Sequence, residues 1–598
     1  MPSAPSILDP DLSRSTAGRS LAGLLERLRS TREAAFALHE TGAAARPYVL
    51  AGLYKALGGQ MLVVVPTADV AERTFADLLY YLEEDAENAP VALMRPRDES
   101  IGALESPSER SARMTLLADL AANRSTIVVA PVAAMRQYLM PRTTFEALSF
   151  KLETGKEAGF EAAQERLFRL GYHRVDVVSA AGEYAVRGGL IDVFAATAAR
   201  PTRVEFFGDD VDSIRPFEVQ SQRSDAGEPL QTLEIAPWSE IPRDPIYRER
   251  VSERVAGEAG VVSAVRAYLA GGAEIPEAWL GLAYDERATL FDYLSERALV
   301  VLQEPQMLAT VDESLALERS REQEVLLAGV ESGELDVRDD DVGEALLADV
   351  SAPYPNLPAL REELARATTL VIAGAIEGHD ADSWMPRVLE RYVLETRPAE
   401  HFQRRLEPFL EAVRAAVAEG ETIWLVVAGA SRLIEMLRAA GLSAERGTPR
   451  ALLAGGAVYV DQGSIDAGFS IPDLRLRVFG DREIYGQGQK RVKLRAVKEG
   501  VPVTLSELAV GDFVVHAVHG IGQYLGLRTE TILGTTSDYL DLQYAGNDRM
   551  LVPVHQMHMV TKYNAGEGVA PRLSRMGGAD WARTKSRVSE QLAKIADD

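Results

Sequence analysis

Residues 183–224 constrain the fold of this chain more than any other stretch, because short apolar and alternating segments follow one another there between turn residues. The strands that we expect are residues 184–187, 190–194, 203–207 and 211–214. Gly188, Gly189 and Gly208 stand between these segments, where a positive φ permits a tight turn or a bulge. The pattern therefore predicts a small antiparallel sheet.

The alternation along the third of these segments separates the two faces of the sheet. Val204 and Phe206 point to one face, and Arg203 and Glu205 point to the other. We expect Arg187 to share this second, solvated face. On geometry alone, an ordinary sheet with its polar residues in water is the simpler interpretation.

Two blocks in this stretch carry a family resemblance. RGGLIDVF (187–194) and RVEFFGDDVDSIRPF (203–217) are similar, in this order, to the UvrB-homology region shared by the excision-repair protein UvrB and the transcription-repair coupling factor family, Mfd. The resemblance implies a small domain that docks on UvrA, with arginines that meet an acidic surface through bidentate contacts. The positions that match this UvrA contact are Arg174, Arg187, Arg203 and Glu205.

Length and charge limit what the whole chain can be. A chain of 598 residues is too long for one hydrophobic core, so several domains are expected. The net charge of −25 repels phosphates, which argues against tight DNA binding by the chain as a whole. The chain contains no cysteine, and we find no apolar run of membrane-spanning length. We expect a cytoplasmic protein, a monomer, with no membrane contact.

Strands and helices alternate in the first 145 residues, which predicts a parallel sheet and, by the resemblance, half of a RecA-like motor fold. We expect helices at residues 21–39, 69–82 and 109–120, and strands at residues 61–65, 91–95 and 126–130. Further apolar strands are expected at residues 299–302 and 369–373. This part therefore belongs to the multidomain α/β and α+β class.

A motor of this kind holds ATP in a loop that reads GxxxxGK[ST], whose backbone N–H groups, lysine and hydroxyl bind phosphates and magnesium. We assign residues 52–60 to this position. Gly58-Gly59-Gln60 replaces the required Gly-Lys-Ser/Thr, and Lys55 is expected as a solvated helix residue. We therefore expect no catalytic residue, cofactor or metal in this chain. This argues against UvrB, which requires a nucleotide.

Residues 504–563 form a second informative module. LSELAVGDFVVHAVHGIGQYLG (505–526) and DYLDLQYAGNDRMLVPV (538–554) alternate like strands and suggest a small SH3-like barrel. The expected strands are residues 513–516, 524–527, 539–544 and 550–554. Both blocks resemble the CarD-like RNA polymerase-interacting domain of the coupling-factor family, and UvrB lacks such a domain.

In that family the module binds the β subunit of RNA polymerase by laying an exposed strand against a sheet of the partner. The residues that match this strand are Arg528, Thr529, Glu530, Thr531 and Ile532. Glu530 departs from the family pattern, where many relatives have an apolar residue. Either the partner offers a basic contact or Ile532 supplies the apolar one, and in both cases the strand edge must stay unpaired and free of proline.

The expected domains are a UvrB-like degenerate motor domain in two parts (1–145 and 236–385), a UvrA-binding α+β domain (146–235), a small α/β domain (386–486), a linker (487–503), the polymerase-interacting domain (504–568) and the start of a connecting helix (569–598). A nucleic-acid-binding tail is the alternative for the basic residues 487–500. The histidine pairs His516/His519 and His555/His558 lack suitable companion ligands, so we expect no metal there.

The resemblance implies the N-terminal part of a coupling factor: a scaffold that binds RNA polymerase and recruits UvrA in nucleotide excision repair. In that family the ATP-driven DNA translocase, with its ATP, magnesium and main DNA contacts, follows this part. The alternatives are part of a UvrB-type ATP-dependent repair helicase or, for the last module alone, a CarD-type regulator. The altered loop at Gly58-Gly59-Gln60 and the β module at 504–563 favour the scaffold.

Overall fold

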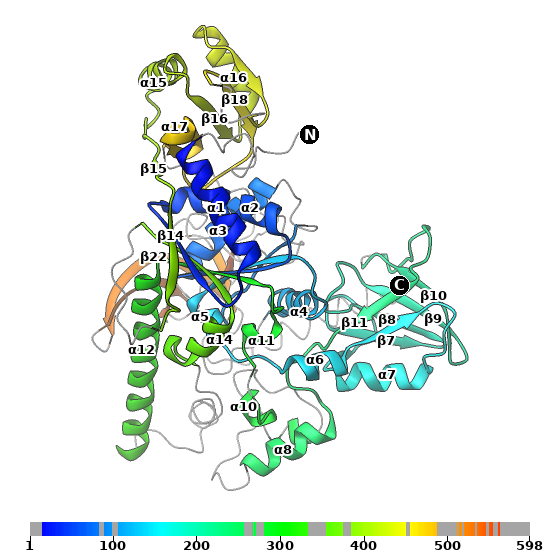
Figure 1. Cartoon of the computed structure of the whole chain (residues 1–598). Helices are drawn as coiled ribbons and strands as arrows, with labels where there is room; N and C mark the ends of the chain where they lie inside the picture. The colour runs from blue at the N-terminus through cyan, green and yellow to red at the C-terminus, as the bar shows by residue number, and fades with distance from the viewer. Residues whose placement is uncertain are drawn as a thin grey trace. The chain divides into compact units, whose positions relative to one another are not determined.

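The computed structural model of the chain describes residues 15–562 with gaps, the larger of which are 98–105, 256–265, 271–279, 333–354, 375–383 and 487–510. The chain divides into two compact units, Met1–Gln489 and Lys490–Asp598. Figure 1 shows the elements of each unit along the chain.

The first unit contains a seven-stranded parallel sheet in the order β14-β1-β13-β12-β2-β4-β3. Its strands are β1 (Ala35–His39), β2 (Gln60–Val65), β3 (Val91–Leu93), β4 (Thr126–Pro131), β12 (Leu299–Gln303), β13 (Thr368–Ile372) and β14 (Val388–Val393). β2, β4, β12 and β13 are buried at every residue. Strands covered on both faces need such continuous apolar runs, and the expected parallel sheet is confirmed.

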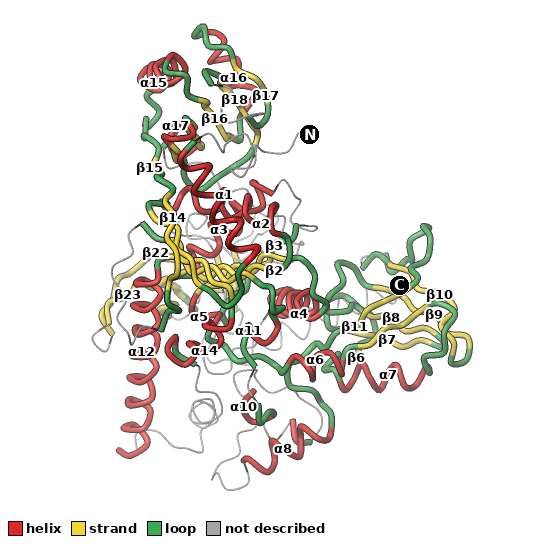
Figure 2. Tube along the Cα trace, in the orientation of Figure 1, coloured by secondary structure: helices red, strands yellow, loops and turns green. Residues whose placement is uncertain are grey.

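Helices cover both faces of this sheet (Figure 2). One core joins it to α1 (Thr16–Ser30), α2 (Arg46–Leu57) and α3 (Ala68–Leu82). The other core joins it to α4 (Pro107–Ala121), α5 (Val132–Met135), α12 (Pro305–Ser332) and α14 (Arg361–Arg366). Further helices are α6 (Arg142–Leu148), α8 (Pro245–Val255), α10 (Leu280–Ala283) and α11 (Leu290–Tyr293), and 3-10 turns lie at Ala43–Ala45, Leu357–Leu360 and Pro472–Leu474.

The prediction of one helix over residues 21–39 is wrong. α1 ends at Ser30, after which Thr31 is extended and Glu33 takes a left-handed φ of 51°. The apolar residues that follow form β1, which pairs with β13 on one side and β14 on the other. Pairing with two neighbouring strands in a buried sheet outweighs the helical spacing of this segment.

An α+β domain lies between α6 and α8. Its five-stranded sheet has the order β10-β9-β8-β7-β6. The elements are β5 (Phe150–Glu153), α7 (Phe160–Arg169), β6 (His173–Arg174), β7 (Glu183–Arg187), β8 (Leu190–Val193), β9 (Thr202–Phe207), β10 (Asp210–Pro216) and β11 (Thr232–Ile235). The four strands predicted for residues 183–224 are confirmed.

A third sheet has the order β15-β19-β20-β16-β18-β17. Its elements are β15 (Arg397–Pro398), α15 (Leu406–Ala418), β16 (Thr422–Val427), α16 (Ala430–Ala439), β17 (Ala444–Arg446), β18 (Val458–Gln462), β19 (Phe469–Ile471), β20 (Leu476–Gly480) and α17 (Asp481–Tyr485). The proposed boundary at 385/386 falls before β14, which pairs with β1 in the first sheet. The third sheet thus begins after β14.

Aromatic side chains join the third sheet to α2 and α3. The ring centroids of Tyr48, Tyr80 and Tyr81 lie 5.9–6.0 Å from that of Trp424, and Phe469 lies 5.8 Å from Tyr48. The Tyr80 hydroxyl donates to Asp461 at 2.8 Å. Because Trp424 is fully buried, this joint is part of a continuous core.

A buried carboxyl group lies at the same joint. Asp77, on α3, is 5% exposed and accepts a hydrogen bond from the backbone N–H of Asp466 at 2.9 Å. Burial raises the pKa of Asp77 to about 8, and the charges of Asp466 and Glu483 act in the same direction against Arg73. Asp77 therefore holds a proton at neutral pH.

We predict that this proton makes the stability of the first unit depend on pH. The unfolded chain loses the proton near the ordinary pKa of 3.8, whereas the folded chain keeps it up to about pH 8, so stability falls as the pH rises between these values. The slope from this group is at most about 1.4 kcal/mol per pH unit. Asp77→Asn should remove it, and urea unfolding of both proteins between pH 5 and 8 would refute this if their slopes were equal.

The second unit contains one antiparallel sheet in the order β24-β23-β22-β21-β25. Its strands are β21 (Phe513–His516), β22 (Gly520–Ile532), β23 (Thr535–Gln543), β24 (Arg549–Pro553) and β25 (Val560–Lys562). A small core contains Val514, Tyr524, Leu540, Leu542 and Tyr544. The four strands expected here, at residues 513–516, 524–527, 539–544 and 550–554, correspond to β21, β22, β23 and β24.

Some expectations fall outside the described residues: the linker at 487–503, the pair His555/His558 and the helix at 569–598. Within the described ranges, no group of three or more potential metal-ligating side chains occurs. None of the helices described is both long and apolar enough to cross a membrane.

Candidate protein-binding surfaces

The expected polar face of the inserted domain is organised by strand register. Arg187 lies opposite Leu190, Leu190 lies opposite Glu205, and Glu205 lies opposite Ser213. Residues directly opposed in neighbouring antiparallel strands project from the same face of a sheet. The structure therefore brings Arg187 and Glu205 together on one face, and Arg203 lies on this face two residues before Glu205.

Arg203 is held within the domain instead of standing in solvent as expected. Its Nε and Nη2 donate to the two carboxylate oxygens of Asp192 at 2.7 and 2.8 Å, and its guanidinium lies 5.2 Å from the centroid of the Phe217 ring. The side chains of Arg203 and Asp192 are 18% and 4% exposed. On this half of the face, the Arg203–Asp192 ion pair therefore satisfies its own charges within the domain. It lies beside a small core of Val178, Ala185 and Phe217.

The other half of the face is open. Arg187 is exposed and donates to the backbone oxygen of Asp176. Glu205 accepts a hydrogen bond from the Ser213 hydroxyl at 2.9 Å and is half-buried. Arg174 is also exposed, but it lies on the edge strand β6 opposite Tyr184, whose side chain belongs to the other face of the sheet. Arg174, Arg187 and Glu205 can thus meet a partner directly, whereas Arg203 mainly orients Asp192.

Arg203→Glu is expected to destabilise the domain, because the new carboxylate would face the buried Asp192 across the ladder. Loss of one partner of a buried ion pair destabilises a protein by about 3–5 kcal/mol. Because the Arg203 side chain is partly exposed, we expect a loss of unfolding free energy near the lower of these values. Arg187→Glu, at an exposed position of the same sheet, should change the stability by less than about 0.5 kcal/mol. Urea unfolding of the two variants measures both effects, and equal midpoints would contradict this role of Arg203.

Residues 528–532 lie in the second half of β22, which pairs with β23 from Gln523 to Ile532. On its other side β22 pairs with β21 only from Gly520 to Gln523. Among the described strands, none pairs with the second edge of residues 529–532, as the edge-binding mechanism requires.

The register fixes which backbone groups reach this edge. Ile532 lies opposite Thr535 across a two-residue loop, so these two form the hydrogen-bonded pair next to the turn. Thr531 and its partner Thr536 then form a pair without ladder hydrogen bonds. The N–H of Thr531 points to the free edge of β22, and that of Thr536 points to the opposite edge of the hairpin.

The segment assigned to the nucleotide loop lies elsewhere. Residues 52–60 are the end of α2 and the start of β2, with Gly58 and Gly59 in left-handed turns. The loop that joins the first strand to the first helix after it is residues 40–45, ETGAAA. The assignment was wrong because β1 was not recognised as a strand, but this loop also lacks the Gly-Lys-Ser/Thr sequence.

An ion pair bridges the strand ends beside this loop. Arg46, 5% exposed at the start of α2, donates to Thr41 O at 3.1 Å and pairs with Glu304, which directly follows β12. Glu304 also accepts from the backbone N–H of Gly374, after β13, at 3.3 Å. A carboxylate of the chain thus lies at the carboxyl ends of the parallel strands, where doubly wound sheets bind anionic ligands.

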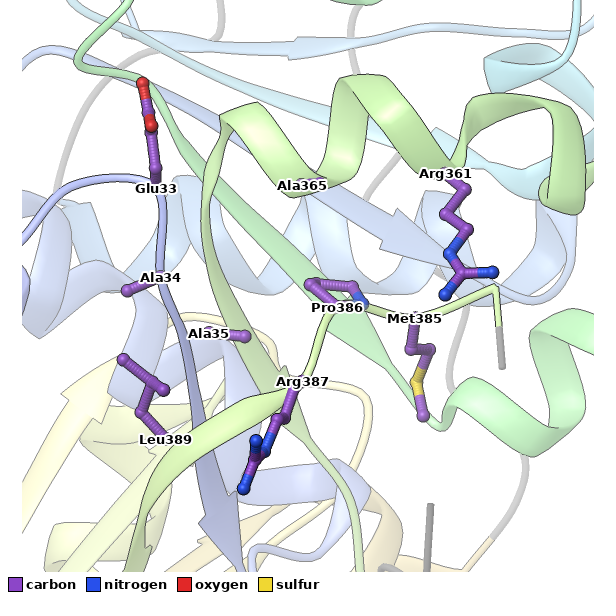
Figure 3. A pocket seen from close by; sticks show the side chains of 9 residues that line it. All are labelled: Glu33, Ala34, Ala35, Arg361, Ala365, Met385, Pro386, Arg387 and Leu389. Atoms are coloured by element: carbon purple, nitrogen blue, oxygen red, sulfur yellow. The ribbon is translucent and has the colours of Figure 1, made fainter. Parts of the chain in front are cut away.

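A pocket of about 340 Å³ lies at the opposite ends of the strands, beside Ala34 and Ala35 at the start of β1 (Figure 3). Arg361 and Arg387 and the apolar side chain of Met385 line it. Ligand sites of parallel sheets lie at the carboxyl ends of the strands, so this pocket is not in the position of a nucleotide site.

Two family models match the chain. The UvrB interaction domain matches residues 150–240, and the CarD-like/TRCF RID domain matches residues 508–564. The first range coincides with the inserted α+β domain and the second with the sheet of the second unit. The chain is thus a multidomain protein that combines a UvrB interaction domain with a CarD-like domain.

Curated relatives cover most of the chain. The transcription-repair-coupling factor of Bacillus subtilis (strain 168) is 29% identical over 88% of this chain and 45% of its own length. That of Staphylococcus epidermidis is 26% identical over 93% of this chain and 47% of its own length. The chain is homologous to transcription-repair-coupling factors and spans about half the length of these relatives. A solved XPD helicase aligns with a TM-score of 0.22 at 10% identity, which is too low to support any conclusion.

Sequence reasoning missed Asp192, which holds Arg203. The signal was present in the block RGGLIDVF, because an acidic residue inside an apolar strand needs a partner once it is buried. The hairpin register places Arg203 directly opposite it.

Proposed function

We propose that this chain is a scaffold that recruits UvrA through its inserted domain and binds the β subunit of RNA polymerase through its second unit. The observation that carries the proposal is the presence of both matched domains in one chain, in separate compact units. In this function the first sheet is a degenerate RecA-like fold and the second unit an SH3-like barrel. The scaffold acts as a cytoplasmic monomer in nucleotide excision repair.

In the relatives, the part of the chain that this sequence does not cover would contain the ATP-driven translocase. We propose that the whole protein is a DNA translocase driven by ATP and magnesium, which contacts DNA mainly outside this chain. The net charge of −25 supports this division, because such a surface disfavours phosphates.

The UvrA contact is assigned to the open half of the sheet face, with Arg187 and Glu205, and to Arg174 on the neighbouring edge strand β6. Arg174→Glu and Arg187→Glu should each weaken UvrA binding more than tenfold, since loss of one partner of a close interfacial charge pair costs about 2–5 kcal/mol. Arg366→Glu is the control, because that side chain is 76% exposed on α14 in another part of the unit. Titration calorimetry with purified UvrA measures all three, and unchanged affinity in both first variants would exclude this surface.

The polymerase contact is assigned to the free edge of β22. Thr531→Pro removes an N–H that points to this edge and should abolish binding of the β subunit, while UvrA binding persists. Thr536→Pro is the matched control, because it removes an N–H on the opposite edge of the same hairpin and should leave binding intact. Pull-down with the β subunit tests the pair. Capture by the Thr531→Pro protein at the normal level would show that edge pairing is not the mechanism.

We expect this chain to hydrolyse no ATP, since neither residues 40–45 nor residues 52–60 contain the Gly-Lys-Ser/Thr sequence that binds phosphates and magnesium, and Arg46 beside the first loop is already paired with Glu304. Gln60→Lys should not create activity, because position 60 is the start of β2. A phosphate-release assay over a range of ATP concentrations decides this. A saturable rate that survives repurification would favour the UvrB-type helicase instead.

A further inference from the structure

Phe207 is an apolar side chain that the fold itself does not use. It is 83% exposed, whereas the next most exposed large apolar side chain of the described residues, Leu389, is 57% exposed. Its neighbour Phe206 supplies the packing on the other face, with its ring 5.3 Å from that of Phe160 in an edge-to-face arrangement. An aromatic ring this exposed at the end of a strand is a common feature of protein-binding surfaces.

Phe207 belongs to the open half of the polar face. It is the last residue of β9 and lies two positions after Glu205, so both side chains project from the same face. The row across this face consists of Arg187, Leu190 and Glu205. An apolar centre, Leu190 and Phe207, is thus accompanied by one cationic and one anionic side chain, the composition of an interface centre with a polar rim.

The hairpin that carries Phe207 is fixed in place. Gly208, with φ of 66°, begins the turn, and Asp209 O accepts hydrogen bonds from the N–H groups of Ala158 and Gly159 at 2.9 and 3.0 Å. The Asp209 side chain accepts from the N–H of Phe160 at 3.1 Å. These bonds attach the turn to the start of α7. A ring presented on such an anchored hairpin loses little conformational freedom when it binds.

We infer that Phe207 is the apolar anchor of the UvrA contact and inserts into an apolar recess of UvrA, with Arg187 and Glu205 in charged contacts beside it. The inference rests on the proposed function of this domain. Arg203 acts as a positioning residue, because its pair with Asp192 fixes the half of the face next to the anchor.

The test is calorimetric titration of UvrA into the full chain and its variants. Phe207→Ala should weaken binding at least tenfold without changing the urea midpoint, and Phe207→Leu should restore most of the affinity. Leu389→Ala is the control: it removes the next most exposed large apolar side chain of the described residues, from β14, and should bind as the unchanged chain does.

The outcomes separate this inference from the proposed function. If Arg187→Glu loses affinity and Phe207→Ala does not, the anchor is excluded and the UvrA contact stands. If the unchanged chain does not bind UvrA at all, both are excluded. If Phe207→Ala and Leu389→Ala weaken binding equally, the loss is not specific to this face and the anchor is again excluded.

Discussion

The short ladder between β5 and β11 is the contact on which the placement of the inserted domain depends. Phe150 pairs with Ile235 and Glu153 with Thr232, so the two ends of the inserted domain leave the first module side by side. Glu240, five residues after the end of β11, is fully buried, accepts from the N–H of Met140 at 2.9 Å and pairs with Arg97. The domain can therefore fold as an insertion while its base is fixed to the module that carries it.

This attachment gives the binding face a rigid support. The Tyr172 hydroxyl donates to Ala236 O and accepts from the N–H of Ala196, both at 2.9 Å, which joins the sheet to its base. β22, to which we assign the polymerase contact, belongs in contrast to a separate compact unit. In the proposed function one chain thus offers two independent surfaces, and a substitution on one is not expected to disturb the other.

Much of the architecture could be predicted from periodicity and turn residues, because alternating strands and buried apolar runs are local signals. The strands of residues 183–224 and the parallel sheet are examples. β1 was missed because its five residues continue the apolar spacing of α1, and only pairing with the distant β13 and β14 makes it a strand. The misplaced nucleotide loop followed from this single error. The roles of Arg187 and Arg203 could not be separated either, since the Asp192 pair arises from cross-strand register.

The central claim is that one molecule of this chain binds UvrA and the RNA polymerase β subunit at the same time. Mass photometry of the chain mixed with UvrA and a purified RNA polymerase β-subunit fragment tests it most directly. The account predicts a complex that contains all three proteins, which loses only the β-subunit fragment with Thr531→Pro and only UvrA with Arg187→Glu. Two binary complexes that compete with each other, and no assembly of all three, would contradict it.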